Sequence, residues 1–307
     1  MKIHKDLTEL IGSTPIVSLD RFCGLLNLKK PILAKLEYFN PLGSVKDRAA
    51  LAMIYHAEER GRLKPGGVIV EPAGGNMGTS LAYIAGIRGY RVILAVPDDT
   101  NDEHLKLLKA LGAEIVLTPS GEGIAGAVRY AKDIASRVPN AYMPGQFDNP
   151  ANPLIHAVST AEEIWNDTDG NVDFFVCGVG SGSTITGVSR GLKKHNRNII
   201  TVAVEPENAP LLNDSNEALI HKIQGMGLNH RSNNYDQSVV DLLLTVKDDE
   251  AFRYTRQMAK TEGILAGMSS GAALAAAVTL ARKNPEKSIV VLFADSGERY
   301  MSTDLFG

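Results

Sequence analysis

A turn rich in glycine and hydroxyl side chains is the clearest place where this sequence could do chemistry. Gly178–Thr184 follows an apolar run that ends at Cys177, and it opens a helical pattern. Glycines let the backbone approach a ligand closely, while the free amides and the dipole at a helix start attract a phosphate. The turn lacks the Gly-Lys-Ser/Thr ending of a P-loop. It therefore predicts a phosphate site and leaves a nucleotide, a dinucleotide and a phosphorylated cofactor open.

Three further segments would place polar atoms at the end of a strand or at the start of a helix. They are Asn40–Arg48, Glu71–Gly78 and Gly267–Ala273. In open sheets of parallel strands, ligands bind beyond the carboxyl ends of the strands. These segments therefore narrow the choice of ligand that the glycine-rich turn leaves open.

Together, the four segments resemble the cysteine synthase and cystathionine β-synthase family, which are fold-type-II pyridoxal-phosphate enzymes, and specifically the O-acetylserine sulfhydrylases. The similarity runs nearly from end to end. It includes Ile11–Pro15, Glu163–Gly170 and Ser296–Tyr300. Agreement of so many segments in order and spacing is not expected by chance. The resemblance implies pyridoxal 5'-phosphate as the cofactor and a fold like that of the tryptophan synthase β-subunit.

Lys46 matches the lysine of the family's cofactor-binding motif, here Ser44–Arg48. The resemblance implies that Lys46 holds the cofactor aldehyde covalently and, once released, removes the α-proton of the substrate. Spacing alone does not distinguish Lys46 from the other lysines, for which a solvated surface charge is the ordinary role. A helix start would favour the neutral amine that this chemistry needs.

The remaining cofactor contacts are implied in the same way. Asn76 would bond the ring hydroxyl, and Ser269 would meet the pyridine nitrogen. A hydroxyl partner leaves that nitrogen largely neutral, which favours loss of a β-substituent over transamination. A turn role for Asn76 and a helix cap for Ser269 are the structural alternatives. The residues implied to hold the phosphate are Gly180, Ser181, Gly182, Ser183 and Thr184.

The loop for the substrate carboxylate departs from the family pattern. The family reads Thr-Ser-Gly-Asn-Thr, whereas residues 73–77 read Ala-Gly-Gly-Asn-Met, so three hydroxyl donors are missing. A hydrogen bond to a charged group contributes roughly 1.5–3 kcal/mol, which backbone amides would have to replace. The substrate contacts implied by the resemblance are Gly74, Gly75, Met77, Gln146 and Gly225.

A second departure follows Gln224–Gly227. A small, apolar stretch that ends in proline is usual in the family, but residues 228–235 are polar, and the segment 210–221 before them is short. His230 and Arg231 would either contact a charged substrate tail or lie in a solvated loop. Neither reading changes the expected cofactor.

The leading functional hypothesis is β-replacement that makes cysteine from O-acetylserine and sulfide. An enzyme that consumes cysteine or serine, with release of hydrogen sulfide or formation of lanthionine or cystathionine, is the alternative. A scaffold that binds the cofactor and regulates a partner would not need Lys46. The expected partners are small amino acids with sulfide or a thiol, and a second copy in a homodimer. The altered loop should bind the tail of serine acetyltransferase poorly.

Short apolar runs alternate with amphipathic helical patterns, which predicts an α/β protein with mostly parallel sheets covered by helices. The expected strands are Val68–Glu71, Arg91–Val96, Glu114–Leu117, Val172–Cys177, Ile199–Val204, Leu242–Val246 and Ser288–Phe293. The expected helices are Leu105–Leu111, Ile124–Ile134, Asn152–Trp165, Thr184–Lys194, Asp249–Glu262 and Ser270–Arg282. The Pro- and Gly-rich stretch 144–153 suggests one domain over 41–148 and another over 149–307, with 1–40 packing on the second.

Composition excludes several classes of protein. The 307 residues are 44% apolar and 22% charged, with a formal net charge of −3, which fits a globular protein. Without a basic face, nucleic acid is not an expected partner. No apolar run reaches the ~20 residues that span a bilayer, and we see no secretory signal, so we expect a cytoplasmic enzyme. Two cysteines offer neither a disulfide framework nor a metal site.

Overall fold

The computed structural model describes residues 3–73, 75–210, 212, 220–227 and 232–307. The chain forms two compact units. The first comprises Met1–Ile11 and Lys46–Ala151, and the second comprises Gly12–Val45 and Asn152–Gly307. The sequence placed the division at residues 41 and 148 and assigned all of 1–40 to the second half, whereas in the structure residues up to Ile11 lie with the first unit.

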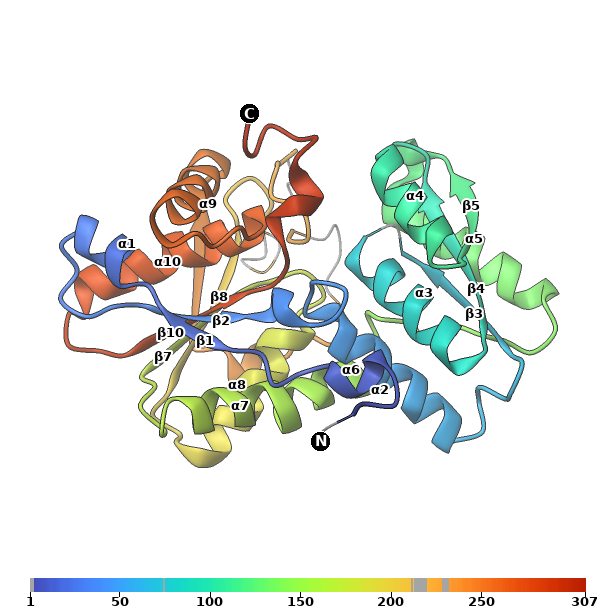
Figure 1. The fold of residues 1–307 in the computed structure, drawn as a ribbon, viewed down its shortest axis with the longest axis horizontal. Coiled ribbons are helices and arrows are strands. Elements are labelled where there is room, and N and C mark those ends of the chain that lie inside the picture. Colours follow the sequence, from blue (N-terminus) through green and yellow to red (C-terminus); the bar gives the residue numbers. More distant parts are fainter. Residues whose placement is uncertain (1–2, 74, 211, 213–219, 228–231) are drawn as a thin grey trace. The chain divides into compact units, whose positions relative to one another are not determined.

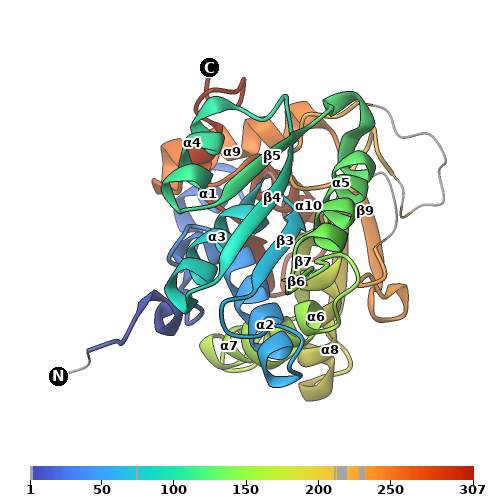
Figure 2. The same cartoon turned by 90° about the vertical axis from the view of Figure 1, so that its right-hand side faces the viewer.

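The first unit is built on a sheet of four parallel strands in the order β5-β4-β3-β6. The strands are β3 (Val68–Pro72), β4 (Arg91–Pro97), β5 (Glu114–Thr118) and β6 (Ala141–Tyr142). The helices are α2 (Lys46–Glu59), α3 (Asn76–Arg88), α4 (Asp102–Ala110) and α5 (Gly123–Arg137). Val68 and Val70 on β3 pack with α5, while α3 lies against the opposite face, so both faces of the sheet are covered (Figure 2).

The second unit contains a six-stranded sheet in the order β1-β2-β10-β7-β8-β9. Its strands are β1 (Ile16–Ser18), β2 (Leu33–Leu36), β7 (Phe174–Gly178), β8 (Ile200–Pro206), β9 (Leu242–Val246) and β10 (Ile289–Phe293). β1 pairs antiparallel to β2, and the other pairs are parallel. The predicted fold class, with mostly parallel sheets covered by helices, is confirmed.

Helices cover both faces of this second sheet (Figure 1). On one face lie α1 (Asp20–Leu25), α9 (Asp248–Glu262) and α10 (Met268–Lys283), and on the other α7 (Ala161–Asp167) and α8 (Ser183–His195). Neighbouring residues of one strand enter different cores: Val176 packs with the α9 and α10 side, and Phe175 with the α7 and α8 side. This alternation follows from the two-residue period of a strand.

Shorter elements complete the chain. α6 (Ala151–Ile155) runs into a π-helical turn at His156–Thr160, which leads directly into α7. Short 3-10 turns occur at Leu7–Leu10, Glu37–Phe39, Ser120–Glu122, Gln237–Val239 and Gly297–Tyr300. No helix within the described parts of the chain has the length and apolar character that a membrane crossing requires.

Candidate active site

The predicted phosphate turn lies at the carboxyl end of β7 and leads into α8, as the sequence indicated. No side chain of the described residues caps the start of α8, where Gly182 occupies the capping position with a φ of 76°. Ser181 and Ser183 are buried, and the Ser181 hydroxyl donates to the Ser183 hydroxyl at 3.1 Å. The result is a helix start that presents amides, its dipole and clustered hydroxyls, which is a favourable environment for a phosphate.

Two glycines of this turn are required by the packing around them. A Cβ on Gly180 would lie 2.3 Å from the carbonyl oxygen of Gly225, and a Cβ on Gly182 would lie 2.5 Å from the Cβ of Tyr235. The Gly227 amide donates to the Val179 carbonyl at 3.2 Å, which holds the two loops together. The structure thus brings the predicted substrate contact Gly225 beside the predicted phosphate turn.

Ser269 lies in the first turn of α10, near the same loop. The Gln224 amide donates to the sulfur of Met268 at 3.1 Å, so the residue preceding Ser269 contacts the segment that carries Gly225. Ser270 accepts a hydrogen bond from the Ala294 amide at 3.2 Å. The start of α10 is therefore fixed both to the loop at 224–227 and to the residue that follows β10.

Lys46 is the first residue of α2, which is the helix start that the sequence predicted for it. The residue before it, Val45, donates its amide to the Ala294 carbonyl at 2.8 Å, so the chain enters α2 from a fixed point at the end of β10. The next two residues, Asp47 and Arg48, are buried, and Asp47 accepts a 2.5 Å hydrogen bond from Ser80 of α3. Their burial indicates a structural role for this charged pair.

The predicted substrate loop lies between β3 and α3. Gly75 occupies the capping position of α3, and no side chain among the described residues caps that helix. Asn76 is its first residue, and Met77 is buried. A Cβ on Gly78 would lie 2.2 Å from the carbonyl oxygen of Ala73, so the loop turns tightly back on the helix. Gly74, like His230 and Arg231, lies outside the described residues.

Gln146, the other predicted carboxylate contact, is held by a buried carboxylate at the end of β3. Glu71 accepts the Gly145 amide through one oxygen and the Gln146 amide through the other, both at 2.9 Å. Burial raises the pKa of Glu71 to about 7, the two amides oppose that rise, and the charge of Asp148 adds to it. Glu71 thus links the strand that leads into the substrate loop to the segment that carries Gln146.

Sequence reasoning missed two residues that support predicted contacts. Glu71 was quoted within a motif without a role, although a glutamate that ends an apolar strand is a signal in itself. His156 was placed in a helix only. It is 1% exposed, and its ring nitrogens lie 2.9 Å from the Thr160 hydroxyl and 3.4 Å from the Thr184 hydroxyl. His156 therefore supports a residue of the phosphate turn.

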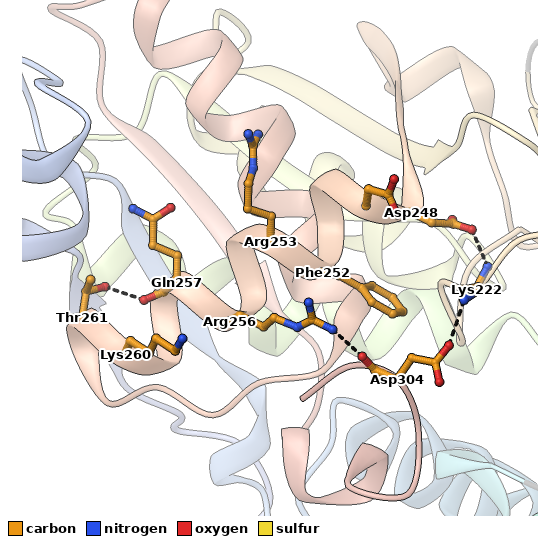
Figure 3. Close-up of a pocket in the computed structure, with 10 residues that line it drawn as sticks. Lys222, Asp248, Phe252, Arg253, Arg256, Gln257, Lys260, Thr261 and Asp304 are labelled. Carbon is orange, nitrogen blue, oxygen red and sulfur yellow. Dashed lines mark hydrogen bonds and ion pairs between the residues drawn. The ribbon is translucent and has the colours of Figure 1, made fainter. Parts of the chain in front are cut away.

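A surface hollow of about 650 Å³ lies along α9 in the second unit (Figure 3). Arg256 reaches the C-terminal segment, where its guanidinium donates to the carbonyls of Asp304 and Leu305, and Lys222 pairs with the Asp304 carboxylate at 2.8 Å. Among the described residues, none that is predicted to bind cofactor or substrate lines this hollow. Its visible contacts tie the C-terminal segment to α9.

Comparisons with known proteins place the chain in a family. Residues 7–295 match the model of the pyridoxal-phosphate dependent enzymes. Cysteine synthase A of Salmonella typhi is 46% identical over 99% of this chain and 96% of its own length. The crystal structure of the Entamoeba histolytica cysteine synthase is 40% identical, covers 99% of this chain and 91% of its own, and superposes with a TM-score of 0.95.

A hydrogen sulfide-producing enzyme from Fusobacterium nucleatum is also similar in structure. It is 37% identical, covers 97% of this chain and 100% of its own, and has a TM-score of 0.93. The chain belongs to the family of pyridoxal-phosphate dependent enzymes. Within that family it is an enzyme of the cysteine synthase type, which confirms the resemblance seen in the sequence.

The residues present fit the cofactor. A phosphate monoester needs several donors in a confined space, and the uncapped start of α8 with the hydroxyls of Ser181, Ser183 and Thr184 supplies them. The glycines are held by crowding that leaves no room for a side chain. Pyridoxal 5'-phosphate is therefore the cofactor for which this turn is suited.

Proposed function

We propose that this enzyme catalyses β-replacement on O-acetylserine, with acetate as the leaving group and sulfide as the nucleophile, giving cysteine. The observation that carries the proposal is the position of Lys46 as the first residue of α2, directly after a segment fixed to the end of β10. The 46% identity to a cysteine synthase over almost the whole chain supports the same reaction.

The proposed roles follow the elements. When bound, pyridoxal phosphate withdraws electrons from the substrate Cα, which makes loss of the α-proton and of the β-substituent feasible. Lys46 anchors the cofactor and then acts as the base that takes the α-proton. Gly180–Thr184 hold the phosphate. Asn76 orients the ring through its hydroxyl, and the Ser269 hydroxyl faces the ring nitrogen without protonating it.

The substrate carboxylate is proposed to bind the first unit. Amides at the start of α3, in the loop that includes Gly74, Gly75 and Met77, would replace the missing hydroxyl donors, with Gln146 beside them. Gly225 would line the substrate site next to the phosphate turn. His230 and Arg231 are proposed to contact the substrate tail or to lie in solvent, as the sequence suggested.

A second reaction is favoured by one observation. Met77 is buried, apolar and unbranched where cysteine synthases usually have a threonine hydroxyl, so this loop suits a different amino-acid donor. A structural relative is a hydrogen sulfide-producing enzyme. The alternative proposal is therefore β-elimination or β-replacement on cysteine or serine, with hydrogen sulfide, lanthionine or cystathionine as product.

The proposed assembly follows from the resemblance to the cysteine synthase family. The protein would act as a cytoplasmic homodimer on small amino acids. The carboxyl-terminal tail of serine acetyltransferase would bind weakly, because the loop at 73–77 lacks hydroxyl donors for its carboxylate.

Incubation of purified holoenzyme with O-acetylserine, O-phosphoserine, serine and cysteine in turn, with and without sulfide, tests the proposal. The proposed function predicts cysteine from O-acetylserine and sulfide as the fastest reaction. Hydrogen sulfide release from cysteine as the fastest reaction would establish the alternative instead.

A further inference from the structure

The first unit contains a buried carboxylate that, among the described residues, binds the segment that carries Gln146. Glu71 is 0% exposed and lies near the carboxyl end of β3. Burying a carboxylate is unfavourable unless it is well hydrogen-bonded. Here each oxygen accepts one backbone amide, Gly145 on one side and Gln146 on the other. The arrangement requires two acceptor oxygens, which a glutamine side chain does not have.

The same residue stands next to both segments that would receive the substrate carboxylate. Two residues beyond Glu71, the chain enters the loop at 73–77. Figure 2 shows β6 beside β3, and Ile69 pairs with Tyr142, so the segment after β6 passes the end of β3. Within that segment, Asn149 donates to the Pro144 carbonyl at 2.9 Å and closes the turn that carries Gln146.

The backbone at this turn needs an external anchor. Gly145 has a φ of 67°, in the left-handed region, and its carbonyl accepts the amides of Asp148 and Asn149. The amides of Gly145 and Gln146 therefore point away from the turn and toward β3, where Glu71 accepts them. Without that acceptor, the backbone of Gln146 would no longer be held in place, and its side chain would lose its orientation.

We propose that Glu71 is a positioning residue for the substrate, because its carboxylate fixes the Gly145–Gln146 backbone to the strand that begins the 73–77 loop. The inference rests on the proposed function, since it assigns the substrate carboxylate to Gln146 and to that loop. Glu71 itself does not contact the reacting atoms. It acts through the orientation of Gln146.

Glu71→Gln tests the proposal because the new amide retains size but offers only one acceptor and places an NH₂ against a backbone N–H. We expect the KM for O-acetylserine to rise about tenfold or more, with kcat and the KM for sulfide changed less than about threefold. Glu71→Asp keeps both oxygens on a shorter side chain. Its KM for O-acetylserine should lie between that of the natural protein and that of Glu71→Gln. Glu71→Asp also serves as the test if the glutamine variant does not fold.

Two comparisons separate positioning from a merely structural role. In a Gln146→Ala background, Glu71→Gln should raise the donor KM by less than about threefold, since both changes remove the same contact. Glu58→Gln is the matched control: it loses bonds from Arg88 and Tyr90 at the other end of the unit and should leave the donor KM unchanged. The proposal would be overturned if the donor KM of the double variant rose by the product of the two single effects. It would also be overturned if Glu71→Gln lowered kcat alone.

The binding of L-serine and L-alanine, followed by the cofactor absorbance, keeps this test independent of the reaction. Both ligands carry the α-carboxylate whichever donor the enzyme uses. Tenfold weaker binding to Glu71→Gln supports the positioning role even if O-acetylserine proves not to be the donor. Equal binding to natural protein and variant would refute it even if cysteine synthase activity is found.

Discussion

Two charged side chains in the first unit show which roles can be inferred from the sequence and which require the structure. Lys46 was recognised through its motif, and the structure places it at the start of α2 as expected. Glu71 carried no assigned role until its two amide partners were seen, because contacts over 74 and 75 residues are not readable from local pattern. Motifs reveal residues that contact ligands more readily than residues that hold those contacts in place.

Lys46→Ala should give a folded, colourless protein that no longer turns over. Loss of the covalent anchor and of the proposed base should lower kcat at least about 100-fold. Absorbance of the purified protein and steady-state kinetics measure both effects. Lys64→Ala, an exposed lysine of the same unit, is the control and should remain yellow and active. Ordinary activity in the Lys46 variant would show that another group is the base.

Glu71 should also give the stability of the fold a pH dependence. Burial raises its pKa from 4.5 to about 7, so the folded protein keeps this proton where the unfolded chain has lost it. The associated stability is present below the unfolded pKa and is lost as the pH rises through about 7. Tyr142 and Asp148 are the neighbouring titratable groups.

The two pKa values correspond to about 3 kcal/mol of unfolding free energy between about pH 4.5 and about pH 7.5. Urea unfolding of the natural protein and of Glu71→Gln across this range measures the difference. The natural protein should lose more stability on going to higher pH than the variant does. Parallel pH profiles would mean that Glu71 is not the group responsible.

At the scale of elements, strands with a continuous apolar run could be predicted from the sequence. A strand whose apolar run is interrupted by a charged residue could not. All seven expected strands are present, as β3, β4, β5, β7, β8, β9 and β10, because each is a short, largely apolar run. β2 was missed because it contains Lys35, a lysine that looks exposed in sequence. In the structure Lys35 is 0% exposed and pairs with Glu163 at 2.9 Å and with Asp167 at 3.2 Å.

The elements around the proposed site also differ in how well the sequence predicts them. The turn at Gly178–Thr184 was predictable because its glycines and the following helix are contiguous. The π-helical turn at His156–Thr160 was predicted as ordinary helix, since an extra residue in one turn leaves no clear mark on the helical period. That Gly225 lies beside Gly180 depends on a loop contact, which only the folded chain reveals.

Gly180→Ala should impair cofactor binding through the phosphate turn. The added Cβ would meet the Gly225 carbonyl at 2.3 Å, and backbone on both sides must shift. We expect at least about tenfold weaker retention of pyridoxal phosphate, since displaced donors lose charge-assisted hydrogen bonds. Dialysis of the variant, followed by the absorbance of the cofactor that remains bound, measures this retention.

Gly191→Ala is the control for crowding alone, because its Cβ would meet the Cβ of Ala161 at 2.3 Å, further along the same helix. It should lower stability without a matching loss of cofactor. Equal cofactor loss in both variants would mean that crowding of α8, rather than the turn, explains the effect.

Restoring hydroxyls to the substrate loop tests its role in donor choice. Ala73→Thr, Gly74→Ser and Met77→Thr together should improve kcat/KM for O-acetylserine by about tenfold, since each hydroxyl can donate to the carboxylate. Use of the enzyme's preferred donor, if different, should fall. Kinetics with the four donors compare the natural and restored proteins. A change below about twofold for every donor would make the loop a neutral variation.

At the scale of the whole molecule, the chain has one parallel sheet and one mostly parallel sheet, each with helices on both faces. Of the residues proposed to bind cofactor or substrate, Lys46, Asn76, Met77 and Gln146 belong to the first unit, and the phosphate turn, Gly225 and Ser269 belong to the second. The family model matches the chain from residue 7 to residue 295, a range that includes parts of both units. We therefore expect activity only when both units are present, and the predictions concern the intact holoenzyme.

The most direct test of the proposed function is the rate of cysteine formation from O-acetylserine and sulfide by the intact holoenzyme, with products identified by mass. We expect cysteine and acetate in equal amounts, with a kcat/KM above that for O-phosphoserine, serine or cysteine as donor. We also expect that Lys46→Ala abolishes the reaction. No cysteine from O-acetylserine, with rapid hydrogen sulfide release from cysteine instead, would contradict the proposed function.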